Sequence, residues 1–176
     1  MEQTKQEKAE FLYRSAMKYI YGDGVPEDNE LAAKLLTEAA SLGHAEASYN
    51  LGICYHYGFG VTIDLKKAYE CYLQAANSGY GRGMELIGRF YKQGIYLETN
   101  YEEAVRWYQK AAESEDILAV AEAEFELGRC CMEGKGVPQS REKAIAWYRK
   151  AAAHGQERAK QALQEETAMS HDCQKE

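Results

Sequence analysis

Apolar residues recur along the chain with a helical period, and glycines interrupt the pattern at regular intervals. Apolar positions at i, i+1 and i+4 predict the buried face of a helix. Each of these runs ends at a glycine, which adopts the left-handed conformation of a helix C-terminus without steric cost. The glycines Gly22, Gly58, Gly94 and Gly134 lie 36, 36 and 40 residues apart. A period of this length predicts stacked helical repeats, because one such unit is too small to bury its own apolar face.

A second helix is predicted in every repeat by a residue that can cap its N-terminus. Asp28, Asp64, Asn100 and Ser140 stand at equivalent positions after the glycines, and their side chains can accept a hydrogen bond from a free backbone amide. Each second helix then carries a bulky pair, to fill the space between repeats, and an alanine pair, to let helices approach closely. The bulky pairs are Leu35 and Leu36, Cys71 and Tyr72, Trp107 and Tyr108, and Trp147 and Tyr148; the alanine pairs begin at Ala39, Ala75, Ala111 and Ala151.

The pattern predicts one domain over residues 1–168. Its four repeats cover about 9–43, 44–79, 80–115 and 116–155, a capping helix follows over about 156–168, and 169–176 form a flexible tail. The last spacing is four residues longer, which is about one helical turn. These residues lie in SEDILAVAEAEFELG and are expected to lengthen the first helix of the fourth repeat. The third repeat departs from the pattern at Tyr96 and Leu97, where Gly-Val stands elsewhere.

The repeated pattern LGxxYxxGxGVxxDxxKAxxWYxKAAxxG, over about residues 9–159, resembles the Sel1-like repeat, a relative of the tetratricopeptide repeat. The resemblance implies an all-α fold, a right-handed α-α superhelix (solenoid) of four helix-pair repeats. It also implies a non-enzymatic adaptor or scaffold for protein complexes, often bacterial, with no cofactor. In a cysteine-rich secreted branch of the family, cysteines bridge the helices at the positions of Ala40 and Ala47. The alanines here argue against that branch.

Composition and charge narrow the function further. A net charge of -7 and a pI near 5.3 argue against sequence-independent nucleic-acid binding, which needs a dense basic surface. No stretch is apolar enough for a membrane-spanning helix or a signal peptide, so the cytoplasm is the expected location, and export without a cleavable signal stays open. The four histidines lie in different repeats or the tail, so no metal site is expected. Cys54, Cys71 and Cys131 are expected to be small buried hydrophobes.

Two stretches match S-x-x-K, the nucleophile motif of penicillin-recognising enzymes. They are Ser15 with Lys18 and Ser140 with Lys143. No K-T-G follows, Ser140 is a predicted N-cap, and Ser15 occupies the position of a repeat leucine. We therefore expect no enzymatic activity. The alternative is a cell-wall or β-lactam hydrolase, an activity attributed to the cysteine-rich branch of the similar family.

By the same resemblance, the first helices line the concave face, and their positions i, i+4, i+7 and i+8 point into it. Tyrosine, methionine and arginine are frequent in binding hot spots. The predicted groove is aromatic toward its N-terminal end and basic in its middle. The expected contacts are Tyr13, Met17 and Tyr21 in the first repeat, Tyr49, Ile53, His56 and Tyr57 in the second, Arg82, Arg89 and Lys92 in the third, and Phe125 and Arg129 in the fourth.

The expected partner is another protein, bound through an acidic or apolar peptide segment. Arg89 and Arg129 would contact carboxylates, and the aromatic residues would contact apolar groups. Two alternatives stay open: the aromatic side chains pack between neighbouring first helices, or the partner binds on the convex side. Self-assembly is a third possibility, although a monomer is expected.

Overall fold

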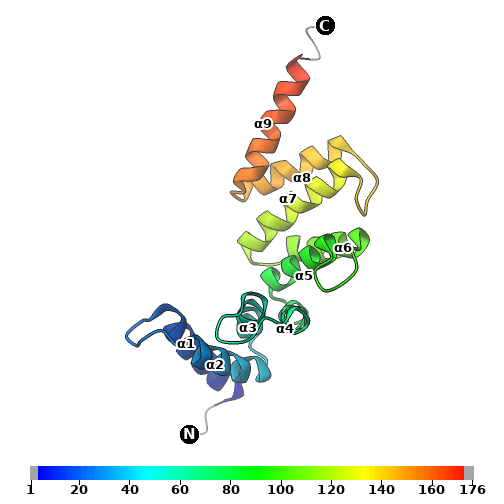
Figure 1. The fold of residues 1–176 in the computed structure, drawn as a ribbon. Coiled ribbons are helices and arrows are strands. Elements are labelled where there is room, and N and C mark those ends of the chain that lie inside the picture. The colour runs from blue at the N-terminus through cyan, green and yellow to red at the C-terminus, as the bar shows by residue number, and fades with distance from the viewer. Residues whose placement is uncertain (1–3, 173–176) are drawn as a thin grey trace. The chain divides into compact units, whose positions relative to one another are not determined.

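The structure is a computed structural model and describes residues 4–172. These residues form nine helices and no strand (Figure 1). The all-α repeat fold predicted from the sequence is therefore confirmed. The helices are α1 (Lys5–Tyr21), α2 (Asn29–Ser41), α3 (Ala45–Tyr57), α4 (Leu65–Asn77), α5 (Gly81–Gln93), α6 (Tyr101–Ala112), α7 (Ile117–Glu133), α8 (Arg141–Ala153) and α9 (Glu157–Asp172).

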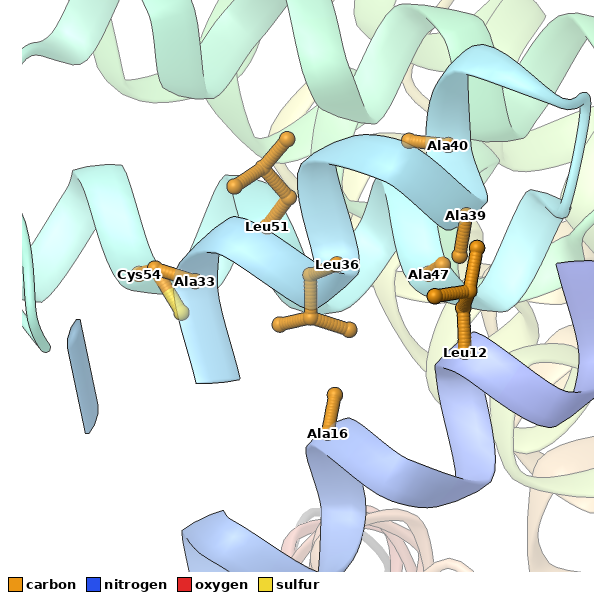
Figure 2. Close-up of a cluster of buried hydrophobic side chains, with 9 residues drawn as sticks. All are labelled: Leu12, Ala16, Ala33, Leu36, Ala39, Ala40, Ala47, Leu51 and Cys54. Atoms are coloured by element: carbon orange, nitrogen blue, oxygen red, sulfur yellow. The ribbon is translucent and has the colours of Figure 1, made fainter. Parts of the chain in front are cut away.

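The chain divides into two compact units, Met1–Ile87 (unit 1) and Gly88–Glu176 (unit 2). In unit 1, α1 packs on α2, α2 on α3, and α3 on α4. Figure 2 shows the core that these contacts create, with Leu36 of α2 pointing toward Ala16 of α1. The core residues are Leu12, Ala16, Ala33, Leu36, Ala39, Ala40, Ala47, Leu51 and Cys54.

In unit 2, α6 packs on α7, α7 on α8, and α8 on α9. Its core includes Phe125, Tyr148 and Ala159, and the last of these comes from α9 and is fully buried. The predicted capping helix thus covers the last repeat. It ends at Asp172 rather than at the predicted residue 168, because the sequence up to Asp172 contains no glycine or proline to end it. Residues 173–176 of the predicted tail lie outside the described residues.

The predicted N-caps are confirmed in all four repeats. Asp28 accepts a hydrogen bond from the Leu31 amide at 2.9 Å, and Asp64 accepts one from the Lys67 amide at 3.0 Å. Asn100 and Ser140 do the same in the later repeats, at 3.0 and 3.3 Å. The extra turn of the fourth repeat is also confirmed: α7 has 17 residues, whereas α3 and α5 have 13.

In repeats two to four, a glycine in the middle of the first helix lies against a tyrosine ring of the second helix. The glycines are Gly52, Gly88 and Gly128. A Cβ added to Gly52 would lie 2.6 Å from two ring carbons of Tyr72, and one added to Gly128 would lie 2.5 Å from two ring carbons of Tyr148. Both tyrosines are buried. A side chain at either glycine would therefore collide with a ring that is already packed on all sides.

A second close contact joins the loop glycines Gly60 and Gly136 to the preceding repeat within their own units. A Cβ on Gly60 would lie 2.0 Å from the carbonyl oxygen of Asn29, at the start of α2, and Gly136 meets Tyr101 in the same way. The corresponding Gly24 has nothing within 4 Å. Tyr96 takes this position in the third repeat and has a left-handed φ of 64°.

No helix among residues 4–172 combines the length and the apolar character that crossing a membrane requires.

Candidate partner-binding surface

The first helices of repeats one and two are joined through His44, the N-cap of α3. Its Nδ1 accepts a hydrogen bond from the Ala47 amide at 3.2 Å, and its Nε2 lies 3.0 Å from a carboxylate oxygen of Glu10 in α1. Because Nδ1 is an acceptor, Nε2 carries the proton and donates it to Glu10. Hydrogen bonds from His44 and Arg14 lower the pKa of the Glu10 carboxyl group. This contact fixes α1 beside the start of α3.

Two of the predicted aromatic contacts have packing roles between helices. The Tyr13 ring stacks on His44 with their centroids 4.5 Å apart, and burial together with a hydrogen bond to Glu46 raises the pKa of Tyr13. The Tyr49 ring lies 5.8 Å from Tyr72 and 5.2 Å from Tyr80. Both side chains are half-buried, so part of each ring holds neighbouring helices together.

Two other predicted aromatic residues of unit 1 are open to solvent, and His56 beside one of them is half-buried. Tyr21 ends α1 and is 71% exposed, and Tyr57, its equivalent at the end of α3, is 59% exposed. The Tyr57 ring stacks on His56 at 4.6 Å and lies 5.9 Å from the ring of Phe59, which is 50% exposed. We call His56, Tyr57 and Phe59, together with Tyr21 at the equivalent position of the preceding repeat, the aromatic patch. Phe59 was not among the residues predicted from the sequence, although an aromatic side chain between two turn glycines could have indicated an exposed ring.

The remaining predicted apolar residues of unit 1, Met17 and Ile53, are half-buried. Met17 lines a cavity of about 280 Å³ together with Tyr21, Arg14, Lys18 and Asp23. The cavity is therefore lined by apolar, positively charged and negatively charged side chains.

Phe125 of unit 2 belongs to the core of that unit. It is 7% exposed, its ring lies 5.6 Å from that of Tyr148, and the guanidinium group of Arg158 lies 4.5 Å over its face. Phe125 therefore offers a partner little free surface unless Arg158 moves.

Two of the predicted cations of unit 2 already have acidic neighbours. Arg129 pairs with Glu126 at 3.6 Å and with Glu133 at 3.3 Å, and Lys92 pairs with Glu126. The carboxylates neutralise most of the basic character that the sequence suggested at this position. Arg82 and Arg89 are half-buried on α5 and belong to different units.

The S-x-x-K serine of repeat one is bonded within its own helix. The Ser15 hydroxyl donates to the carbonyl oxygen of Phe11 at 2.8 Å. Among the described residues, no group of three or more histidine, cysteine, aspartate or glutamate side chains is placed to hold a metal ion. Cys54 and Cys131 are buried, as predicted, and Cys71 is half-buried.

Comparison with protein families gives a match over most of the chain. The model of the Sel1 repeat matches residues 9–44, 45–80, 81–116 and 121–156. The gap at 117–120 coincides with the first turn of α7 and falls within SEDILAVAEAEFELG, the stretch predicted to contain the four extra residues. A search of curated proteins finds no match.

Three solved structures illustrate the similarity. A Sel1 repeat protein from Oxalobacter formigenes is 29% identical with a TM-score of 0.81, over 86% of this chain and 60% of its own. The protective antigen c5321 of uropathogenic Escherichia coli, which has an SLR fold, is 32% identical with a TM-score of 0.81, over 88% and 32%. The cysteine-rich protein B of Helicobacter pylori, 21% identical with a TM-score of 0.50 over 89% and 95%, shares the fold alone. The chain thus spans less than two thirds of the first two proteins.

Proposed function

Because the chain belongs to the Sel1 repeat family, whose members generally mediate protein–protein interaction, we propose that it is a non-enzymatic adaptor with its partner site on unit 1. The observation that carries the proposal is the aromatic patch. Tyr21 and Tyr57 occupy equivalent positions in successive repeats, and both are largely exposed. Exposing an aromatic side chain to water is unfavourable in free energy, and groups of such side chains are typical of surfaces that bind another protein.

The patch favours an apolar anchor on the partner. Tyr57 is held by its stacking on His56 and by its contact with Phe59, so these rings lose little conformational freedom on binding. An acidic partner segment has less support, because Lys92 and Arg129 are paired with carboxylates of the same chain. We therefore propose a peptide segment or helix with a large apolar side chain as the bound group.

The experiment is affinity capture from the native lysate with matched variants. The first variant, Tyr21→Ser with Tyr57→Ser, removes the exposed rings of unit 1. The control, Ile117→Ser with Leu118→Ser, removes apolar side chains of similar exposure from α7. A protein retained by wild type and by the control but lost by the first variant supports the proposal, and each lost ring should weaken binding by about 1–3 kcal/mol. A protein retained equally by all three places the partner site elsewhere.

A further inference from the structure

One side of the α1–α2 pair is open at three positions of α1 that are buried in all later repeats: Phe11 and Lys18 are exposed, and Ser15 is half-buried. Phe11 is 62% exposed, whereas Ala47 and Ala123, at the same repeat position, are fully buried. Ser15 stands where the second and fourth repeats have buried leucines. We call this side the free face. It consists of Phe11, Ser15, Lys18, Tyr19, Val25, Leu31 and Leu35.

Another repeat cannot cover the free face in the way that repeats stack within unit 1. The position of Phe11 corresponds to Gly83 in α5, where an added Cβ would lie 2.8 Å from the backbone nitrogen of Ala76 and 3.0 Å from the Cβ of Ala75. A benzyl group at that position keeps a neighbouring helix from approaching as closely. The surface that covers Phe11 must therefore offer a recess.

Such a recess lies on the free face itself. Ser15, Lys18 and Tyr19 follow Phe11 on the same side of α1 by one to two turns, and with Leu31 and Leu35 they line a cavity of about 380 Å³. A protruding ring and an apolar recess on one face are self-complementary when two copies meet about a two-fold axis. We propose that two copies of the chain pair through the free face, with Phe11 of each copy in the recess of the other.

The charges along α1 fit the same pairing. The first turn of α1 carries Glu7 and the last turn carries Lys18. An antiparallel crossing that places Phe11 over the partner's Ser15 has its centre near residue 13, and it also places Glu7 close to the partner's Lys18. Within the part of the chain that the structure describes, the Lys18 ammonium group makes no ion pair. The crossing thus gives this cation a carboxylate, and it opposes the two helix dipoles favourably.

This pairing differs from the monomer expected from the sequence, and it is tested by molar mass in solution. Light scattering after size exclusion should give wild type a mass that rises with concentration toward twice the 19.9 kDa of the chain. Phe11→Glu should weaken pairing at least tenfold, because it places a charge in an apolar recess. Tyr21→Ser, which removes an exposed ring of α1 that does not line the recess, should not change it. Circular dichroism checks that each variant is folded.

The charge pair gives a second test. Glu7→Lys and Lys18→Glu should each pair poorly with themselves, because like charges then meet at both ends of the crossing. An equimolar mixture of the two variants should pair again. At one end of the mixed crossing the introduced lysine faces the introduced glutamate, and at the other end the unchanged Lys18 of one copy faces the unchanged Glu7 of the other.

Three results would overturn the proposal: wild type keeps the monomer mass at several hundred micromolar, Phe11→Glu and Tyr21→Ser behave alike, or the mixture of charge variants stays monomeric. The partner captured through the aromatic patch should be retained by Phe11→Glu. This last measurement separates the pairing proposal from the proposed function, because each can fail without the other.

Discussion

The contact between Gly52 and the Tyr72 ring predicts that Gly52→Ala destabilises the protein. A glycine-to-alanine change inside a helix ordinarily stabilises by about 1 kcal/mol, because alanine is the better helix former. Gly52 lies in α3, away from both ends. Helix propensity alone therefore predicts a gain in stability, and packing predicts a loss, so the sign of the measured change decides between them.

The structure gives the size of the opposing effect. The new Cβ would lie 2.6 Å from two ring carbons of Tyr72, about 1 Å inside an ordinary carbon–carbon contact. The ring is 1% exposed and cannot turn aside into solvent. Overpacking of this kind costs about 1–3 kcal/mol, and a collision with two atoms of a confined ring belongs in the upper part of that range. After the gain in propensity, a net loss of about 1–2 kcal/mol is expected for Gly52→Ala.

Repeat one supplies the control, because it has Ala16 and Leu36 at the same two positions, both fully buried. In a Tyr72→Leu background, Gly52→Ala should therefore be neutral or stabilising by up to about 1 kcal/mol. Urea unfolding of the four proteins, followed by circular dichroism, gives the coupling free energy of the cycle, expected at about 1–3 kcal/mol. If the alanine has the same effect in both backgrounds, or stabilises the protein with Tyr72 present, the packing argument is wrong.

Two further predictions concern backbone approach and thiol chemistry. Gly60→Ala should prevent folding of unit 1 or destabilise it by more than about 3 kcal/mol, because its Cβ would lie 2.0 Å from the Asn29 carbonyl oxygen. The control is Gly24→Ala, which has a similar φ and nothing within 4 Å and should cost only about 1–2 kcal/mol of backbone strain. Equal urea midpoints for the two variants would contradict this prediction. Burial, with a smaller contribution from Glu70, raises the pKa of the Cys71 thiol to about 11. Only the thiolate reacts with iodoacetamide, so the rate of Cys71 alkylation should rise about tenfold per pH unit from about pH 8 toward that pKa. Mass spectrometry follows the modification of Cys71. A rate that levels off near the ordinary thiol pKa of about 8.5 would show that Cys71 is not shielded.

Much of the fold follows from short-range sequence features. The N-caps at Asp28 and Asp64, the glycine helix ends and the extra turn of α7 depend on residues within a few positions of one another. The repeat spacing then implies stacking, because each pair of helices has an apolar side that needs a neighbour. The end of α9 was misplaced by four residues, since no stop signal marks it.

The number, order and pairing of the helices among the described residues could be read from the chain alone, because they depend on local periodicity and capping. The candidate site was only partly predictable. Position within a repeat assigned Tyr21, Tyr57 and Phe125 to the same predicted groove, yet the first two are exposed and Phe125 is covered by Arg158 of α9. This difference appears only once the chain is folded, because the exposure of a side chain depends on residues that are distant in the sequence.

Residues that are distant in the sequence also determine whether a charged side chain contributes charge to the surface. The sequence shows Lys92 as a cation on a first helix, and the structure places it against Glu126, 34 residues further along the chain. A repeat register identifies which positions are equivalent. Whether the side chain at a position is available to a partner depends on the residues that pack around it. Those residues differ between repeats, because the variable side chains differ.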